Sequence, residues 1–585
     1  MSAMLKDQDL ISVQEVRSKV EEAYAAWQIY RAFSQDQVDA IVEGIAAAAR
    51  ANARRLAELA VEETGYGRAE DKLSKNLLAA DVLPRAMRGL KTIGILRELP
   101  EQKIVEIGVP MGVVAAILPT TNPTSTAIYK TLISLKAGNA VVISPHPRAK
   151  VCSCETAAVM QQAALKAGAP DGLIQCINNS TIEATNALMK HHRTGVILST
   201  GGSGIVRAAY SSGKPAYGVG PGNVPVLLDK SADVEEAVGK IVQGKSFDFG
   251  TVCSSEQALV AEHGLRERIM AALKARKAFL CNAKQTETLA KLLLTPQFTV
   301  NPDCVGQAPT RIAQMAGFEV PVDTSILVVE IKGVGKQHPL SAEKLSPVLS
   351  VYFVADFAAA VDACEAILRF GGLGHTSVIH ANDDARIREY GLRMPSFRVL
   401  VNTPSPQGST GITTNVFPAM TLGCGAVAGN STSDNIGPLH LINIKRLAYV
   451  ARKAEEAFEN PEPSNAIGGI DRPAVVAAVE RYLAKRGVET APPVISSVVD
   501  RFIASKRAPS APATDPSSPM TQPEASPVTI ADFVCEEDVR KAISQSKTIY
   551  VGPKTIVTPS ARDMALRSET LVFTEPSKPL PSRDR

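Results

Sequence analysis

Residues 109–119 read VPMGVVAAILP, a short apolar run that leads into a helical pattern at 125–137 and a second run, NAVVIS, at 139–144. A further helical pattern at 149–167 and the apolar stretches LIQCI and GVILST continue the alternation. Short strands that alternate with helices indicate a mainly parallel sheet with helices on both faces. The sequence therefore predicts an α/β fold, and a second block of the same kind extends from about 226 to 409.

The regions on either side of these blocks have a different composition. Residues 11–90 are rich in Ala, Glu, Arg and Leu at helical spacing, which predicts an N-terminal helical layer. Near the other end, 504–527 contain six prolines among Ala, Ser and Thr, a composition typical of a linker. Two amphipathic stretches, 475–486 and 495–505, precede this linker. A small block at 530–573 follows it, with an expected helical start and a strand-like KTIYVGPKTIVTP.

Charge and cysteine usage exclude several classes of protein. The 585 residues include 63 Lys and Arg against 59 Asp and Glu, so a net charge of +4 gives no electrostatic reason to expect nucleic acid or anionic membrane as a partner. No apolar run is long enough to cross a membrane, and the N-terminus has no secretory pattern. Nine cysteines without CxxC pairs suggest neither a disulfide framework nor a metal site. A reducing cytoplasm fits this usage best.

The segment FDFGTVCSSEQALV, 247–260, is the most informative for chemistry. Its cysteine, Cys253, lies among Gly, Thr and Ser between a helical pattern and an apolar strand, which is unlike the setting of a core cysteine. A buried structural thiol is the alternative, because free cysteine is among the most buried residue types.

This segment resembles the active-site loop of the aldehyde dehydrogenase superfamily, and in particular its CoA-acylating branch, which includes the acetaldehyde and propionaldehyde dehydrogenases of bacterial microcompartments. The resemblance covers about residues 15–455. It rests on seven motifs in order: LPTTNPTST, AGNAVVISPHPRAK, STGGSGIV, GVGPGNVPV, FDFGTVCSSEQ, HPLSAEKLSPVL and GLGHTSVIH. It implies a Rossmann-type cofactor domain with an oligomerisation part (1–227 and 410–455) and an α/β catalytic domain (228–409). A partly disordered C-terminal extension would follow, with the amphipathic helices and linker at 456–527 and a segment of unknown role at 528–585.

The resemblance implies a catalytic role for three residues. Cys253 would attack the aldehyde carbonyl and later carry the acyl group as a thioester. Asn122 matches the side-chain donor to the oxyanion, although an Asn before Pro also stabilises turns. His375 resembles a histidine near the active site that could hold or deprotonate the thiol of coenzyme A, or it could be structural.

The identity of the acyl acceptor follows from a missing base. Hydrolytic relatives carry a glutamate that activates water, and Gly218 stands at that position here. A second thiol exchanges readily with a thioester, so coenzyme A is the expected acceptor. Glu256, close after the cysteine, is the alternative base. A hydrolytic dehydrogenase and a non-catalytic scaffold remain as alternative functions.

The cofactor site is expected at STGGSGIV, where a strand enters a glycine-rich turn that opens a helix, a geometry suited to a pyrophosphate. The resemblance assigns Thr200, Gly201 and Gly202 to this site. It places Ser144 and His146 near the adenosine part of NAD and assigns Glu343 to the nicotinamide ribose hydroxyls. An ordinary helix start and a solvated surface glutamate are the alternatives.

Partners and location are inferred from the same resemblance. A small aliphatic aldehyde, with residues around 414–417 shaping its pocket, and a homodimer or homotetramer are expected. The stretches within 475–505 resemble short helices that dock enzymes to microcompartment shells. The protein is therefore expected in the cytoplasm, inside a bacterial microcompartment.

Overall fold

The computed structural model describes residues 7–295, 298–458, 472–485, 495, 497–500, 530–545, 548–558, 561, 565 and 570–573. The chain separates into two compact units, Met1–Ala457 and Phe458–Arg585. The first unit carries the predicted α/β blocks and is described first.

The predicted N-terminal helical layer is confirmed. It consists of α1 (Gln8–Tyr30), α2 (Gln35–Ala51), α3 (Ala53–Thr64), α4 (Ala69–Leu77) and α5 (Leu83–Met87). Ser34 and Gln37 start α2 with a reciprocal capping box, and the helix buries Val38, Ile41 and Ile45 on one face. Between α4 and α5 the backbone widens into a π-helical turn, Leu78–Val82. Such turns are found frequently at functional sites.

The first α/β block forms a five-stranded parallel sheet in the order β5-β4-β3-β6-β7. Its strands are β3 (Val113–Ile117), β4 (Ala140–Ser144), β5 (Ile174–Cys176), β6 (Thr194–Thr200) and β7 (Ala216–Val219). The helices α6 (Pro123–Lys136), α7 (Lys150–Lys166), α8 (Ile182–Lys190) and α9 (Ser203–Tyr210) connect them. Every residue of β3 and β4 is buried, as expected for strands covered on both faces.

The second block forms a seven-stranded sheet in the order β10-β11-β12-β9-β8-β13-β14, in which all neighbouring strands are parallel. Its strands are β8 (Val224–Leu228), β9 (Glu256–Glu262), β10 (Phe279–Leu280), β11 (Leu327–Glu330), β12 (Val348–Val354), β13 (Gly374–His380) and β14 (Ser396–Val401). Its helices are α10 (Val234–Ser246), α11 (Arg266–Ala275), α12 (Ala283–Leu293), α13 (Pro309–Met315), α14 (Phe357–Gly371), α15 (Asp384–Arg393) and α16 (Ser405–Ser409). The predicted α/β class is therefore confirmed in both blocks.

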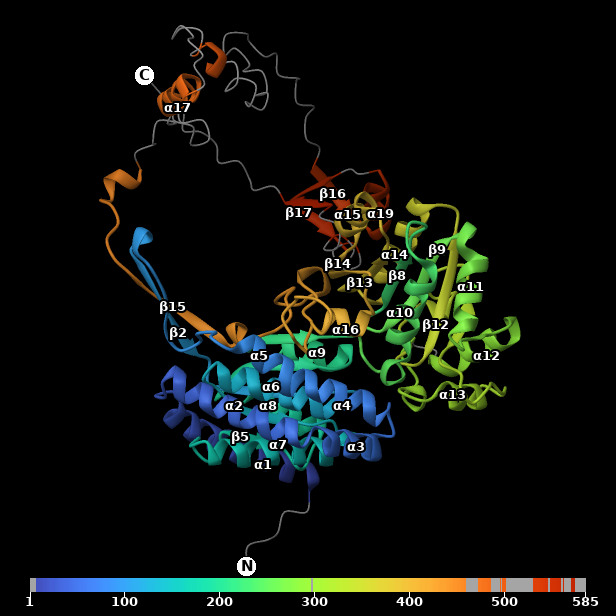
Figure 1. Cartoon of the computed structure of the whole chain (residues 1–585), viewed down its shortest axis with the longest axis horizontal. Coiled ribbons are helices and arrows are strands. Elements are labelled where there is room, and N and C mark those ends of the chain that lie inside the picture. The colour runs from blue at the N-terminus through green and yellow to red at the C-terminus, as the bar shows by residue number, and fades with distance from the viewer. Residues whose placement is uncertain are drawn as a thin grey trace, which may run out of the picture. The chain divides into compact units, whose positions relative to one another are not determined.

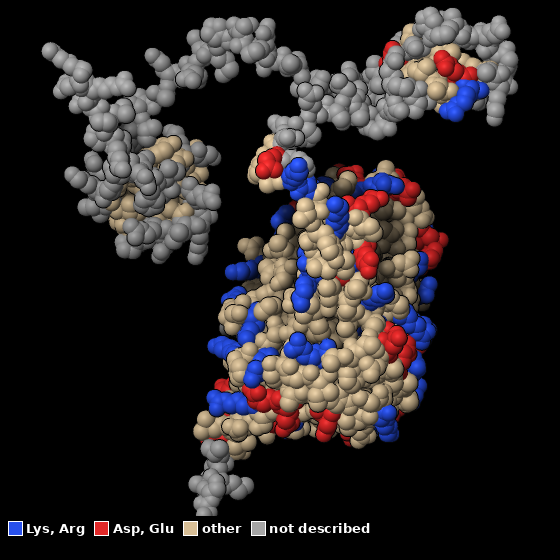
Figure 2. Space-filling view, turned by 90° about the vertical axis from the view of Figure 1, so that its left-hand side faces the viewer, with Lys and Arg blue, Asp and Glu red and all other residues tan. Residues whose placement is uncertain are grey.

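A third, antiparallel sheet joins distant parts of the chain and was not predicted. The strand β2 (Ile104–Pro110) pairs with β1 (Gly94–Leu99) on one side and with β15 (Ile442–Ala448) on the other. Figure 1 shows these strands extending away from the helical layer. On the face of the first unit seen in Figure 2, acidic and basic side chains are interspersed, so this face has no continuous surface of one charge.

The second unit contains α17 (Arg472–Lys485) and a small parallel sheet in the order β16-β17-β18. Its strands are β16 (Ile530–Val534), β17 (Ile549–Val557) and β18 (Leu571–Phe573), with α19 (Glu536–Ser544) between the first two. The predicted helical start of this block was wrong, because a strand rich in apolar residues precedes the helix. Of the stretch 495–505, the described residues 495 and 497–500 are helical. The predicted linker 504–527 lies outside the described residues.

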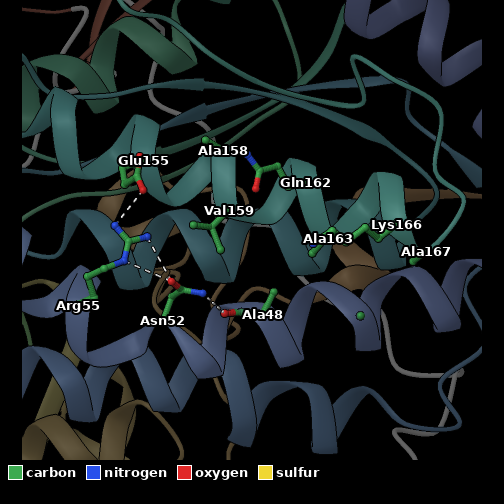
Figure 3. Close-up of a pocket in the computed structure, with 11 residues that line it drawn as sticks. Ala48, Asn52, Arg55, Glu155, Ala158, Val159, Gln162, Ala163, Lys166 and Ala167 are labelled. Atoms are coloured by element: carbon green, nitrogen blue, oxygen red, sulfur yellow. Dashed lines mark hydrogen bonds and ion pairs between the residues drawn. The ribbon is translucent and has the colours of Figure 1, made fainter.

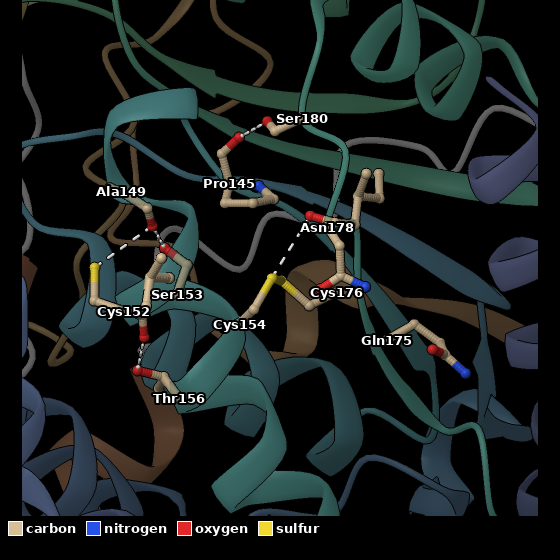
Figure 4. Close-up of a disulfide and its surroundings, with 12 residues drawn as sticks. Pro145, Ala149, Cys152, Ser153, Cys154, Thr156, Gln175, Cys176, Asn178 and Ser180 are labelled. Atoms are coloured by element: carbon tan, nitrogen blue, oxygen red, sulfur yellow. Dashed lines mark hydrogen bonds between the residues drawn. A yellow bond between two sulfur atoms is a disulfide. The ribbon is translucent and has the colours of Figure 1, made fainter. Parts of the chain in front are cut away.

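One pair of cysteines forms a disulfide, although the cysteine spacing suggested no disulfide framework. Cys154 on α7 and Cys176 on β5 form a disulfide (Figure 4). Sequence spacing does not reveal this pair, but the packing of α7 against β5 brings the two Cα atoms to 5.4 Å, within disulfide range. Cys152 takes no part in this pair, and its sulfur donates to the carbonyl of Ala149 at 3.4 Å.

A further groove on the surface of the first unit, of about 580 Å³, lies between α2 and α7, where Arg55 donates to Glu155 and Asn52 (Figure 3). It contains none of the predicted site residues. Among the described residues, no helix has the length and apolar content needed to span a membrane.

Candidate active site

A cleft of about 600 Å³ lies where the carboxyl ends of β3, β4, β6 and β7 meet loops of the seven-stranded sheet. In the strand order β5-β4-β3-β6-β7, successive connections run in opposite directions from β3, so the strand order reverses beside it. Ligands of open α/β sheets bind outside the carboxyl ends of the strands at such a reversal. The topology alone therefore selects this cleft as the candidate binding site.

The cleft brings together most of the residues that the sequence singled out. One wall comes from the five-stranded sheet and supplies Asn122, Ser144, His146, Thr200, Gly201 and Gly202. The opposite wall supplies Thr251, Cys253, Glu343 and Leu345. His375 does not line the cleft. Positions that lie more than 200 residues apart in the sequence thus face one cavity.

Cys253 follows a tight turn whose backbone is unusual. Within the 3-10 turn Phe247–Gly250, Asp248 and Phe249 have φ of 47° and 51°, in the left-handed region. Such residues cost about 1–3 kcal/mol each and persist where surrounding contacts hold them. The Asp248 carboxylate provides these contacts, accepting the backbone N–H of Arg68 at 2.7 Å and the hydroxyl of Thr251 at 2.6 Å.

The Cys253 thiol is strongly disfavoured as a thiolate in this setting. Burial, followed by the neighbouring Glu343 carboxylate, raises the pKa of Cys253 to about 12. Arg398 opposes this shift but does not overcome it. This environment therefore favours the neutral thiol at physiological pH.

Asn122 begins α6 as its N-cap residue, but its side chain makes no capping hydrogen bond. Its Nδ2 donates to Thr121 Oγ1 at 2.9 Å, and its Oδ1 accepts from the Nζ of Lys75 at 2.5 Å. The amide is thus held by side chains and lines the cleft. This arrangement removes the turn-stabilising alternative considered for an Asn before Pro.

Glu343 is buried, with 8% of its surface exposed, and it lines the cleft. Its Oε1 accepts the backbone N–H of Gly222 at 3.0 Å. Burial raises the pKa of Glu343 to about 8. Since Glu343 lies in the cleft wall, the alternative of a solvated surface glutamate does not apply.

Two residues bear on the identity of the catalytic base. Gly218 has no room for a side chain, because an added Cβ would lie 2.8 Å from Val206 and 3.0 Å from the ring of Tyr210. Glu256 lies on β9 and points toward α10 and α16, where its Oε1 accepts the N–H of Ser405 at 2.6 Å. In the described part of the chain, Glu343 is the one carboxylate that lines the cleft. The alternative in which Glu256 activates water in the cleft is therefore wrong.

His375 lies near the backbone of Cys253, although it does not line the cleft. A Cβ placed on Gly222 would be 2.3 Å from the Cys253 carbonyl oxygen and 3.0 Å from the His375 ring, so both groups lie against the same face of Gly222. Burial, with Arg398 adding to it, lowers the pKa of His375 to about 3. The sequence did not show that this histidine would be fully buried. Its Nδ1 contacts Thr376 Oγ1 at 3.0 Å, and its Nε2 is buried without a hydrogen-bond partner among the described residues.

The glycine turn fits a dinucleotide phosphate. The strand β6 ends at Thr200, Gly202 is the N-cap of α9, and α9 begins at Ser203. A Cβ on Gly202 would meet no atom within 4 Å, so the space in front of the helix N-terminus is open. Backbone N–H groups and the positive end of the helix dipole favour an anion here.

Two lysines and an aspartate that support the catalytic wall were missed in the sequence. Lys72 and Lys75 of α4 both form ion pairs with Asp248. The available signal was the pair of lysines on a helix face that also buries Asn76 and packs against α3 and α6. A pattern of charged residues in a short helix normally indicates a solvated face, so it did not point to this contact.

Comparisons with known proteins agree with this geometry. The model of the aldehyde dehydrogenase family matches residues 3–289. A bifunctional aldehyde-alcohol dehydrogenase of Escherichia coli is 42% identical over 459 residues, which cover 78% of this chain and 51% of that protein. The chain thus spans about half the length of the curated relatives of this kind.

Solved structures match over most of their length. An acetylating aldehyde dehydrogenase from Geobacillus thermoglucosidasius is 50% identical with a TM-score of 0.76, covering 77% of this chain and 99% of that one. Two propionaldehyde dehydrogenases are each 28% identical and cover 74% of this chain. One, from Rhodopseudomonas palustris with bound propionyl-CoA, has a TM-score of 0.68 and 94% coverage of its own chain. The other, from a fucose utilisation microcompartment of Clostridium phytofermentans, has a TM-score of 0.67 and 97% coverage.

The first unit has an α/β architecture with a Rossmann-type cleft, and this cleft places a cysteine on the wall opposite Asn122. The first unit is also similar to these proteins over most of its length. The chain belongs to the aldehyde dehydrogenase family.

Proposed function

We propose that this protein oxidises a short aldehyde with NAD and transfers the acyl group from Cys253 to coenzyme A. The observation that carries this function is the composition of the cleft. It contains a cysteine and an amide donor, and its one carboxylate among the described residues, Glu343, is engaged by the N–H of Gly222. Such a cleft can form a thioester, and because Glu343 is the residue expected to hold the nicotinamide ribose, no second carboxylate among the described residues that line it is left to activate water. Similarity to an acetylating relative and to one with bound propionyl-CoA supports the same acceptor.

The residues would act in the following order. The Cys253 thiol loses its proton to solvent as its sulfur bonds to the carbonyl carbon of the aldehyde, and the carbonyl oxygen becomes an oxyanion that accepts a hydrogen bond from Asn122 Nδ2. NAD, when bound, accepts the hydride from this carbon. The carbonyl then reforms as a thioester on Cys253. The sulfur of coenzyme A attacks that carbonyl, the bond to Cys253 breaks, and the Cys253 sulfur takes up the proton that the thiol of coenzyme A gives up.

The cleft residues would hold NAD along its length. The turn Thr200–Gly202 and the N-terminus of α9 would bind the pyrophosphate, and Glu343 would accept hydrogen bonds from the nicotinamide ribose. Ser144 and His146 line the part of the cleft expected to take the adenosine. For His375, whose burial disfavours the protonated form, we propose a neutral hydrogen-bond acceptor near the backbone of Cys253.

A small cavity supports a short aldehyde as substrate. It has room for about one water molecule (10 Å³). Its lining includes Lys75, Leu78, Phe247, Val252, Pro406, Gln407, Thr410, Ile412 and Met420. Val252 directly precedes Cys253, so this cavity suits a methyl group, the alkyl end of a two-carbon aldehyde. The expected residues 414–417 do not line it, and Val416 and Phe417 line another cavity instead.

Two further expectations concern assembly. The edge strands β1 and β15 expose Ile95, Ile444 and Leu447, which supports a homodimer or homotetramer formed by sheet extension. The helix α17 places Val475, Val476, Val479 and Leu483 at half-buried positions, which supports a docking helix for a microcompartment shell in the cytoplasm. Deletion of 472–505 would then abolish co-purification with shells and leave aldehyde oxidation unchanged. Retained co-purification would remove the docking role.

The acceptor is tested by following NADH formation with and without coenzyme A. We expect continuous turnover and acyl-CoA product with coenzyme A, and at most one NADH for each subunit without it. Desulfo-coenzyme A, which lacks the thiol, is the matched control and should not restore turnover. Continuous formation of NADH and free acid without coenzyme A would establish the hydrolytic alternative.

A further inference from the structure

A cluster of buried charges lies directly beneath the catalytic turn. Lys72 and Lys75 on α4 are 2% and 3% exposed, and Asp248, which they both contact, is fully buried. Two cations thus share one anion in the interior. Burying charges costs several kcal/mol for each ion, so an arrangement with one unmatched cation is not explained by stability alone.

Lys75 differs from Lys72 in what else it contacts. Lys75 donates to Asp248 Oδ2, to Asn122 Oδ1 at 2.5 Å and to Thr251 Oγ1 at 3.4 Å. Lys72 donates to the same carboxylate oxygen at 3.1 Å and to the backbone carbonyl of Thr121 at 3.0 Å. Only Lys75 therefore joins the turn before Cys253 to the side chain of Asn122.

The chemistry of this contact decides how the Asn122 amide is oriented. An ammonium group has only donors, so it can be satisfied by the amide oxygen and not by the amide nitrogen. With Oδ1 held by Lys75, Nδ2 must point away from it. One N–H of Nδ2 meets Thr121 Oγ1 at 2.9 Å, and the other remains for the oxyanion.

We propose that Lys75 is a positioning residue that orients the Asn122 amide and, through Asp248, fixes it relative to the loop carrying Cys253. It acts through Asn122 and contacts no reacting atom. The role rests on the proposed function, because it assumes that Asn122 binds the oxyanion. The π-helical turn Leu78–Val82 follows directly after α4, where the helix departs from regular geometry next to this contact. The pKa of Lys75, lowered by burial to about 8, leaves mainly the charged form at neutral pH.

The substitution Lys75→Met tests this role, with Lys72→Met as the matched control. Both variants remove one buried cation and one contact to Asp248, but only the first releases Asn122. The readout is the rate of the first NADH turnover without coenzyme A. This rate reports acylation of Cys253 whichever acceptor follows, so failure of the coenzyme A assignment would not affect the result.

We expect Lys75→Met to lower this rate by about 30- to 100-fold at saturating aldehyde. That magnitude approaches the loss of one oxyanion donor. Because Lys75 also lines the small cavity proposed for the alkyl group, an effect confined to the aldehyde concentration for half-saturation would report that cavity and would contradict the positioning role. Lys72→Met should lower the rate less than fivefold. Equal losses in the two variants would overturn the assignment, since they would indicate a general effect of charge on the turn.

A double-mutant cycle with Asn122→Ala gives the second readout. In the Asn122→Ala background, Lys75→Met should lower the rate less than threefold, because no amide remains to be oriented. The same loss in both backgrounds would show that Lys75 acts independently of Asn122 and would contradict the proposal. If Lys75→Met does not fold, as judged by its thermal unfolding, Lys75→Gln takes its place in the same cycle.

Discussion

The two walls of the cleft are formed by different kinds of structure, strand ends on one side and loops on the other. The wall from the five-stranded sheet consists largely of strand ends, and residues such as Ser144 and Thr200 are the last of their strands. The wall that carries Cys253 and Glu343 consists of loops held by distant groups. The turn before Cys253 is held by Asp248 through α4, and Glu343 accepts a hydrogen bond from Gly222, 121 residues away. The residues expected to bind the cofactor phosphate are thus positioned by local backbone, whereas Cys253 and Glu343 are positioned by contacts between distant parts of the chain.

The largest effect is expected at the nucleophile of the loop wall. Cys253→Ala should lower the rate of aldehyde oxidation by at least about 10⁴-fold, the order of loss seen when a catalytic nucleophile is removed. NADH formation under saturating aldehyde and NAD measures this. Cys424→Ala, which removes a buried thiol near Cys253 but no reacting atom, is the control. Substantial activity in the Cys253 variant would assign the chemistry to another residue.

The raised pKa of Cys253 predicts slow alkylation. A thiol with a pKa of about 12 has far less thiolate at pH 8 than an ordinary cysteine. Iodoacetamide should therefore modify Cys253 about two to three orders of magnitude more slowly than free cysteine, as counted on the peptide that contains it. The rate should rise with pH up to pH 10 without a plateau. A plateau below pH 9 would show that the pKa is not raised.

Loss of the oxyanion donor should have the next largest effect. Asn122→Ala should lower kcat by about a hundredfold or more, with a small change in the KM for aldehyde, because the hydrogen bond forms with the oxyanion rather than with the bound substrate. Steady-state kinetics with coenzyme A present separate the two constants. A loss confined to KM would assign Asn122 to substrate binding.

A change in the strand-end wall should affect cofactor binding only. Gly202 has φ of −64° and open space around its Cβ position, so Gly202→Ala should leave thermal unfolding unchanged. The added methyl group would occupy the approach to the helix N-terminus, and the KM for NAD should rise about tenfold, which corresponds to about 1.4 kcal/mol. An unchanged KM for NAD would place the pyrophosphate elsewhere.

The difference between the walls also explains what the sequence could predict. The strand, glycine turn and helix at 194–210 are consecutive, so their local pattern predicted the order of these elements, and the resemblance to the family assigned the phosphate to the turn. Cys253 and Glu343 were predicted from their motifs. The contacts that hold these residues could not be predicted in this way. The pair Lys75–Asp248 spans 173 residues, and Cys154–Cys176 depends on the packing of a helix on a strand. The burial that lowers the pKa of His375 likewise arises from tertiary structure.

The most direct test of the central claim is the mass of the peptide around Cys253 after the protein reacts with aldehyde and NAD alone. We expect the mass of one acyl group on Cys253, formed together with one NADH for each subunit and removed within seconds after coenzyme A is added. An unmodified Cys253 peptide during NADH formation, or an acyl group that water removes as fast as coenzyme A does, would contradict the account.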